Sequence, residues 1–249
     1  DAKARREALN SRDFDSFIIS GGGYTGIEIA GNIKRGLGGL GSDKRVAIVE
    51  KAPTILGPLP NWIKEYVSSN LKLLGIEVFT NTAIDRAEQG RIRLSNGLSF
   101  ENTMLIWAAG VRTGYLVEQL DAEKNRQGRV RVDRYLRLNE SCFVAGDAAL
   151  FFYKGGDLRM AIQFAIAQGR HAARNIINSL LNKPLKEFRP LDLGYIIPMA
   201  NNRSCGRVLG FNVTGRLATM LHYFMCVYRS LGLDNKIGIL KDLIKGGVL

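Results

Sequence analysis

The sequence contains few of the side chains that build metal centres or disulfide frameworks. Its 249 residues include three cysteines, Cys142, Cys205 and Cys226, and two histidines. The cysteines are too far apart to form a C-x-x-C or C-x4-C pair, which excludes a dithiol active site, a disulfide scaffold and a cysteine-ligated zinc ion. With so few histidines, neither a metal centre nor a Ser-His-Asp triad is indicated.

The sequence also lacks a long apolar run. The longest, residues 217–228, is interrupted by Thr219 and His222, whereas a membrane span needs about 20 consecutive apolar residues. No transmembrane helix is therefore predicted. The chain starts at Asp1 without a secretory signal pattern, and we expect it to be processed, truncated or part of a longer polypeptide.

Acidic side chains are in the minority. There are 35 Lys+Arg and 23 Asp+Glu, giving a formal net charge of +12. A basic chain can bind nucleic acid, but no block of five or six basic residues and no aromatic-basic motif is present, so nucleic acid is not an expected partner. With 46% hydrophobic and 23% charged residues, the composition is that of a globular protein.

Apolar periodicity predicts an α/β fold for the first part of the chain. Residues 14–20, 45–50 and 76–79 have short apolar strand patterns, and helical patterns lie between them. This β-α-β-α-β order indicates a parallel sheet with right-handed crossovers. Residues 83–100 have short strand patterns around an Asn96-Gly97 turn, which predicts an inserted antiparallel meander.

The second half predicts strands at 129–133 and 141–145 and a helix over 160–181. In the last segment, residues 235–245 place four apolar side chains on one helical face and three lysines on the other. The apolar residues are Ile237, Leu240, Leu243 and Ile244, and the lysines are Lys236, Lys241 and Lys245. This pattern is typical of a basic amphipathic helix at a membrane interface.

A G-x-G-x-x-G motif follows the first strand and opens the first helix. Gly21 permits a tight turn, Gly23 lets a pyrophosphate approach the backbone, and Gly26 lets the helix pack closely on the strand. The helix N-terminus then offers N–H groups to the phosphates. The alternative is that these are turn glycines without a binding role.

Glu50 ends the second predicted strand. A carboxylate there can accept hydrogen bonds from both hydroxyls of an adenine ribose, and it repels a 2′-phosphate. NAD(H) is therefore favoured over NADP(H), although the adjacent Lys51 moderates this preference.

Three further motifs carry a family resemblance. The segments 106–112 (IWAAGVR), 143–149 (FVAGDAA) and 162–169 (IQFAIAQG) follow the glycine motif in the chain. Their order and spacing resemble type II NADH dehydrogenases, the single-subunit NADH:quinone oxidoreductases of the FAD/NAD(P)-binding superfamily.

The resemblance implies where each cofactor binds. NAD(H) would be held by Gly21, Gly22, Gly23, Tyr24, Gly26 and Glu50, with Ala109 and Gly110 on the nicotinamide side. FAD would be held by Gly146, Asp147 and Ala165. Glu28 and Gln163 would lie near the isoalloxazine ring as catalytic residues, and a buried carboxylate there could relay protons. The alternatives are a helix-dipole role for Glu28 and an ordinary helical position for Gln163.

The sequence departs from the family pattern at three points. Ala167 replaces a glutamine, Tyr24 replaces a frequent proline, and no FAD fingerprint precedes Phe14. We therefore expect only the C-terminal part of an FAD domain. The predicted layout is a linker or helix over 1–14, an NAD(H)-binding domain over 15–113, FAD-domain residues 114–185 and a basic membrane-associating tail over 186–249.

The predicted function is hydride transfer from NADH to FAD and then to a membrane quinone. The enzyme would be peripheral on the cytoplasmic side of the membrane, with a homodimer left open. Two alternatives remain: a non-catalytic, membrane-associated NAD(H)-binding module, and a related flavin reductase with another acceptor.

Overall fold

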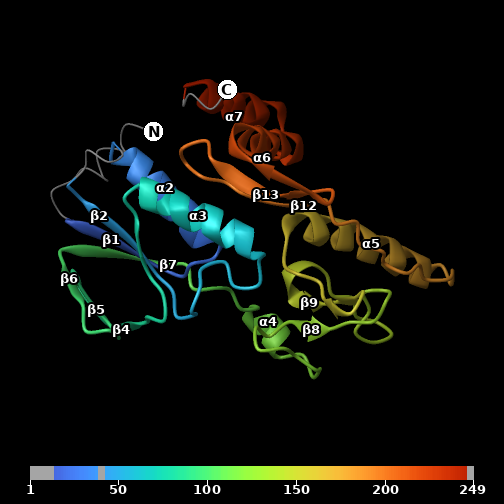
Figure 1. Ribbon diagram of the computed structural model, residues 1–249. Coiled ribbons are helices and arrows are strands. Elements are labelled where there is room, and N and C mark those ends of the chain that lie inside the picture. The colour runs from blue at the N-terminus through green and yellow to red at the C-terminus, as the bar shows by residue number, and fades with distance from the viewer. Residues whose placement is uncertain (1–13, 39–42, 246–249) are drawn as a thin grey trace. The chain divides into compact units, whose positions relative to one another are not determined.

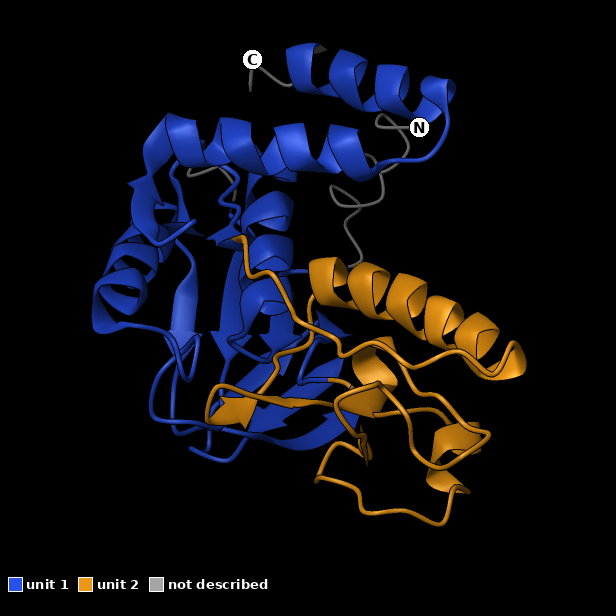
Figure 2. Cartoon of the chain, turned by 90° about the vertical axis from the view of Figure 1, so that its right-hand side faces the viewer, with its two compact units in different colours: residues 1–110, 194–249 blue, residues 111–193 orange. Residues whose placement is uncertain are grey.

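The computed structural model describes residues 14–38 and 43–245. The chain divides into two compact units, residues 1–110 with 194–249 (unit 1) and residues 111–193 (unit 2), shown in Figure 2. The expected linker or helix over 1–14 lies outside the described residues, except for Phe14.

Unit 1 is built on a four-stranded parallel sheet, as the sequence predicts. Its strands are β1 (Ser16–Ser20), β2 (Arg45–Val49), β3 (Glu77–Phe79) and β7 (Thr103–Trp107). They lie in the order β3-β2-β1-β7. All neighbouring pairs are parallel, and β1 is fully buried. The carboxyl ends of these strands therefore share one edge, where α/β sheets bind ligands.

Because side chains alternate along β1, the two faces of the sheet pack against different elements. Phe17 and Ile19 belong to the core cluster that includes Ile27 of helix α2 (Tyr24–Gly36) and Ile63 of helix α3 (Asn61–Leu73). Ile18, which points the other way, belongs to the cluster of the meander. Figure 1 shows α2 and α3 on one side of the sheet.

The predicted meander is antiparallel and consists of β4 (Ile84–Glu88), β5 (Arg91–Leu94) and β6 (Ser99–Glu101). Ile92, Leu94 and Phe100 are buried against the parallel sheet. Since strands have a side-chain period of two, Arg91 and Arg93 on β5 point to solvent.

Most of the basic tail is part of unit 1 and contains a sheet that the sequence did not predict. This antiparallel sheet consists of β12 (Gly194–Ile197), β13 (Ser204–Val208) and β14 (Phe211–Thr214), followed by helices α6 (Gly215–Arg229) and α7 (Leu233–Lys245). Ile197 and Cys205 belong to the core cluster of α2 and α3. Within the described ranges, no helix has the length and hydropathy needed to cross a bilayer.

Unit 2 contains little regular structure apart from one long helix, α5 (Ile162–Leu180). Its short elements are α4 (Tyr115–Glu118), β8 (Val130–Arg131), the 3-10 turn η2 (Gly146–Ala148), β9 (Ala149–Leu150), β10 (Phe152–Tyr153) and β11 (Gly156–Asp157). The strand expected over 141–145 is wrong, since Phe143 forms only an isolated bridge with Arg137. The backbone is still extended at Ala145 and turns into η2 at Gly146.

A buried amide joins α5 to the chain that follows it. Asn175 is fully buried and donates from Nδ2 to the carbonyls of Tyr135 and Lys186, at 3.0 and 2.9 Å. Its Oδ1 accepts from the N–H of Lys186 at 2.9 Å. One side chain thus satisfies three backbone groups.

We expect Asn175→Ala to lower the free energy of unfolding by about 2 kcal/mol, because it removes the three hydrogen bonds that this buried amide makes to backbone groups. The matched control is Asn178→Ala on the same helix, whose amide makes a single long bond of 3.4 Å to the Pro184 carbonyl. Urea unfolding followed by circular dichroism measures both. Equal losses would contradict a special role for Asn175.

Candidate functional site: two nucleotide-binding turns

The glycine motif lies at the shared edge of the parallel sheet in unit 1. Gly21 has φ +112°, and a Cβ there would lie 2.4 Å from the carbonyl oxygen of Ala108. A Cβ on Gly26 would lie 1.9 Å from the carbonyl oxygen of Gly21. Both positions therefore require glycine, because the turn passes directly against β7 and against α2.

Gly23, unlike Gly21 and Gly26, has open space beside its Cα. No atom lies within 4 Å of the place where its Cβ would be. It is the N-cap of α2, and no side chain caps that helix end. An open backbone cradle at an uncapped helix N-terminus fits the pyrophosphate of a dinucleotide.

Glu50 holds this turn in place. Its Oε2 accepts from the N–H of Gly22 at 2.7 Å, and its Oε1 accepts from the N–H of Ala52 at 2.8 Å. Each oxygen has a further lone pair for a ribose hydroxyl. The structure thus brings the predicted acid and the predicted glycines together at one edge.

Two other predicted groups border the same edge. Ala109 and Gly110 follow β7 and are exposed. Ala109 lies next to the glycine turn, since a Cβ on Gly21 would lie 2.9 Å from its Cα. The ring of Tyr24 meets the ring of Tyr195 edge-on, with centroids 6.2 Å apart. Tyr195 belongs to β12, so the unpredicted sheet orients a side chain of the glycine motif.

Glu28 lies one turn into α2. Its side chain keeps contact with solvent, and partial burial by neighbouring atoms raises its pKa above the ordinary carboxyl value. The pKa of the Cys226 thiol on α6 is raised mainly by burial, and the negative charge of Glu28 raises it further. Cys226 Sγ lies 3.6 Å from Nε2 of His222, whose pKa burial lowers.

Unit 2 has its own glycine turn. Gly146 has φ +70°, and a Cβ there would lie 3.4 Å from the Cβ of Ala165 on α5. Its N–H donates to Oε1 of Gln168 at 2.7 Å, and Gln168 is 2% exposed. The predicted residues Gly146 and Ala165 are therefore neighbours, and Asp147 projects from the turn as an exposed carboxylate.

A cavity of about 240 Å³ lies beside Asp147 and is lined by Thr113, Arg129 and Met160. Arg129 is 5% exposed, and its Nη2 donates to the carbonyls of Ala149 and Leu158. Its Nε is buried with no partner among the described atoms. Burial lowers the pKa of Arg129, whereas the carboxylates of Asp157 and Asp147 act in the opposite direction.

Gln168 and Arg129 are binding-site candidates that the sequence did not reveal. The glutamine acts through a backbone group 22 positions away, which no local pattern encodes. Residues 129–133 alternate between polar and apolar side chains. In that pattern Arg129 is on the same strand face as Arg131, so the sequence predicts that its side chain is exposed to solvent. A positive-φ glycine, a carboxylate and a buried cation beside one cavity fit a bound dinucleotide such as FAD.

Gln163, the predicted catalytic amide, is engaged within unit 2. Its Nε2 donates to Oδ1 of Asp192 at 3.1 Å, and its Oε1 accepts from the N–H of Leu193 at 3.1 Å. Arg159 Nη2 also donates to Oδ1 of Asp192, at 2.8 Å. The structure therefore gives Gln163 a role in anchoring the segment that leads to β12.

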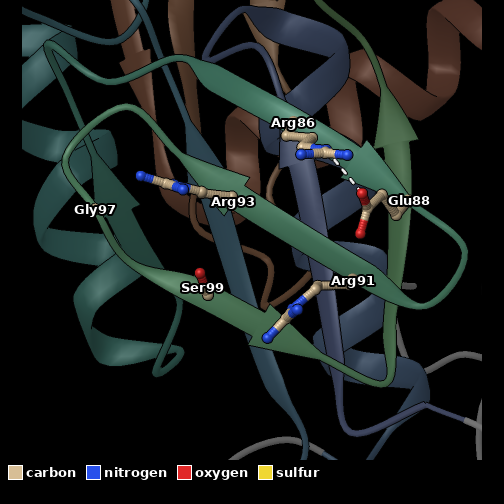
Figure 3. A pocket seen from close by; sticks show the side chains of 6 residues that line it. All are labelled: Arg86, Glu88, Arg91, Arg93, Gly97 and Ser99. Carbon is tan, nitrogen blue, oxygen red and sulfur yellow. Dashed lines mark ion pairs between the residues drawn. The ribbon is translucent and has the colours of Figure 1, made fainter.

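A further hollow lies on the outer face of the meander (Figure 3). Three arginines line it, and each pairs with a carboxylate: Arg86 with Glu88, Arg91 with Glu101 and Arg93 with Asp85. The pair of Arg86 and Glu88 lies within β4, and the other two pairs join neighbouring strands. These exposed pairs neutralise the face, so the hollow is a solvated sheet surface.

The sequence of residues 1–172 matches the family described as pyridine nucleotide-disulphide oxidoreductase. The chain belongs to this family. Curated members similar to it include the type II NADH:quinone oxidoreductases of Haemophilus influenzae and Staphylococcus saprophyticus. The first is 30% identical over 204 residues, covering 77% of this chain and 46% of the relative. The second is 28% identical over 220 residues, covering 83% and 54%.

Solved structures agree on the fold. NDH2 from Plasmodium falciparum in complex with NADH has a TM-score of 0.76 at 14% identity, covering 98% of this chain and 67% of that one. A NAD-dependent persulfide reductase from A. fulgidus has a TM-score of 0.63 at 18% identity, covering 82% and 37%.

The comparisons confirm the resemblance to type II NADH dehydrogenases, and membership of the family implies NAD(H) and FAD as cofactors. The chain spans about half the length of the curated relatives it matches.

We expect Glu50→Gln to weaken NADH binding about tenfold, since an amide replaces one of the two acceptor oxygens that order the turn, and to reduce discrimination against NADPH. Isothermal titration with each nucleotide measures both effects. Glu77→Gln on the adjacent β3, where Glu77 pairs with Arg45, is the control and should leave both affinities unchanged. Unaltered binding by Glu50→Gln would contradict the assignment.

Proposed function

We propose that the protein is an FAD-dependent NADH:quinone oxidoreductase. The observation that carries the proposal is the presence of two nucleotide-binding turns, one in each unit. In unit 1, Glu50 holds a glycine turn at the N-terminus of α2. In unit 2, Gln168 holds the Gly146–Asp147 turn beside a cavity that contains Arg129.

Each turn has its own part in this function. The edge of β1, β2 and β7 would bind NADH, with the helix N-terminus on its phosphates and Glu50 on its adenine ribose. The Gly146–Asp147 turn would bind the flavin, with Asp147 accepting hydrogen bonds from hydroxyl groups. FAD, when bound, supplies the redox chemistry of hydride acceptance, and the protein supplies position and electrostatics.

The membrane quinone is proposed as acceptor because of the surface of α6 and α7. Four large apolar side chains on α6 are exposed at helical spacing: Leu217, Met220, Phe224 and Tyr228. On α7, Ile237, Leu240 and Ile244 are exposed, whereas Leu243 is buried. An exposed apolar helix pair in a basic segment is suited to docking on a bilayer surface, and we assign it to the cytoplasmic side.

The proposal predicts that the protein, purified from its native start, contains flavin whose visible absorption bleaches on anaerobic addition of NADH and returns with a quinone. We expect Asp147→Ala to retain about a tenth or less of the flavin, because a carboxylate acceptor is lost. Glu140→Ala, an exposed acid of the same unit, is the control. A full-length protein without flavin would instead favour a non-catalytic NAD(H)-binding module.

Glu28 is proposed as the acid that returns a proton to the reduced acceptor. Its raised pKa keeps the carboxyl protonated to a higher pH than usual. The rate of quinone reduction should therefore fall as the pH rises through this pKa. Glu28→Gln should remove that pH dependence without changing flavin bleaching by NADH, as rapid mixing over a pH series would show. A variant that keeps the same profile would rule out this role.

A further inference from the structure

Arg129 is a buried cation in unit 2. Its side chain is 5% exposed, and a guanidinium keeps its positive charge in proteins even where burial lowers its pKa, as it does here. Nη2 donates to the carbonyls of Ala149 and Leu158, at 2.6 and 2.9 Å. Nε is buried with no partner among the described atoms. Two neutral carbonyls therefore hold the group in place without neutralising its charge.

The more accessible arginines of unit 2 that lie near carboxylates form ion pairs with them. These pairs are Arg112 with Glu118, Arg131 with Glu123, Arg134 with Glu187, Arg137 with Asp133 and Arg159 with Asp192. Arg129 forms no ion pair within the part of the chain that the structure describes, and the carboxylates of Asp147 and Asp157 act on it only at longer range. Because a charge removed from water is costly unless it is paired, the charge of Arg129 lacks a compensating anion where one matters most.

The cavity of about 240 Å³ lies against this guanidinium, and all of its lining residues belong to unit 2. Asp147 of the turn η2 lines it as well. Arg112 also lines the cavity, but its side chain is 74% exposed and pairs with Glu118. The cavity therefore combines a buried positive charge that no carboxylate neutralises with a carboxylate that can accept hydrogen bonds from hydroxyl groups.

This arrangement fits some parts of a flavin nucleotide and not others. Ribityl hydroxyls suit the carboxylate of Asp147, whereas the permanent negative charge of a pyrophosphate would be repelled by it. The N–H of Gly146 already donates to Gln168, so this turn does not offer it to a phosphate. The flavin ring is neutral when oxidised and becomes negative when reduced, and its charged edge suits Arg129.

Hydride transfer is the step at which this negative charge arises. A hydride carries two electrons and one proton, so its transfer breaks the C–H bond at C4 of NADH and forms an N–H bond at N5 of the flavin. The nicotinamide ring becomes positive, and the flavin gains one negative charge, which is spread over its N1–C2=O edge. A fixed cation shielded from water stabilises such a charge more strongly than an exposed one does.

We propose that Arg129 faces the N1–C2=O edge of the flavin and stabilises its anionic reduced form, which raises the reduction potential of the flavin. This inference rests on the proposed function. It adds to that function a side chain that sets how readily the flavin takes electrons from NADH. Arg129 acts through its charge, and the carbonyls of Ala149 and Leu158 hold that charge at the cavity.

The test measures the reduction potential of the flavin in the protein purified from its native start. Reduction by xanthine and xanthine oxidase with a reference dye gives this potential without NADH. We expect Arg129→Gln to lower the ratio of reduced to oxidised flavin about tenfold, which for two electrons is a potential lower by about 30 mV. The matched control is Arg112→Gln, which removes an exposed, paired charge from the same cavity and should leave the potential unchanged.

Arg129→Lys keeps a positive charge at the same position. Its potential should be close to that of the unaltered protein at low pH and should fall below it as the pH rises. The reason is that a buried lysine loses its proton far more readily than an arginine does.

One measurement needs no variant, and it decides the matter if Arg129→Gln does not fold. Formation of an anionic reduced flavin takes up one proton for two electrons, so the potential of the unaltered protein should fall by about 30 mV per pH unit. A neutral reduced flavin takes up two protons, and the slope is then about 60 mV per pH unit.

The inference is overturned by the steeper slope, or by equal shifts of potential in Arg129→Gln and Arg112→Gln. It is also overturned if Arg129→Gln loses flavin while the flavin that remains keeps its potential, as expected of a contact with a phosphate. A protein without flavin refutes both the inference and the proposed function. Flavin that NADH fails to bleach refutes the proposed function alone, because the shift in potential is measured without NADH.

Discussion

The carboxylate of Glu50 connects the parts of unit 1 on which nucleotide binding depends. Its two oxygens accept from the N–H groups of Gly22 and Ala52, at 2.7 and 2.8 Å. The glycine turn after β1 and the chain after β2 are therefore held at one edge of the sheet. The N-terminus of α2 begins next to that turn, so the same carboxylate also orders the backbone groups that would meet a phosphate.

Unit 2 uses the same principle with a different side chain. The buried amide of Gln168 orders the Gly146 turn through one bond to a backbone N–H, and Arg129 joins two carbonyls beside it. A side chain that binds backbone groups fixes a turn more firmly than the turn's own residues do, because loops have few internal contacts. Each glycine turn is thus bonded by a side chain outside its own motif.

The region from β1 to β7 was predictable because its strands and helices have clear periods. Phe17 and Ile19 alternate with Ile18, and each set packs on a different cover. The sheet β12-β13-β14 was not predictable, since Ser204, Cys205 and Gly206 on β13 have no strand pattern of alternating apolar residues. They are buried because β12, β14 and the α2 and α3 core surround them.

The candidate site residues also divide into those that the sequence could locate and those that it could not. Gly21 and Glu50 could be located from the sequence because each directly follows a strand, and strand ends in a parallel sheet meet at one edge. Gly26, in α2, could be located by its fixed spacing from Gly21. The place of Gln163 near a flavin stays a prediction, and the sequence did not indicate that its amide binds Asp192 and Leu193. Helical position alone does not show which distant backbone reaches a side chain.

By itself, the sequence determined the α/β class, the family and the edge of unit 1 at which the glycine motif and Glu50 meet. These depend on periodicity and on glycine positions, which are local properties of the chain. Only the tertiary structure decided that the tail forms a sheet in the core of unit 1 and that Gln168 and Arg129 support the second turn. The reason is physical: burial and hydrogen-bond partners are set by residues far apart in sequence, and they exist only after the chain has folded.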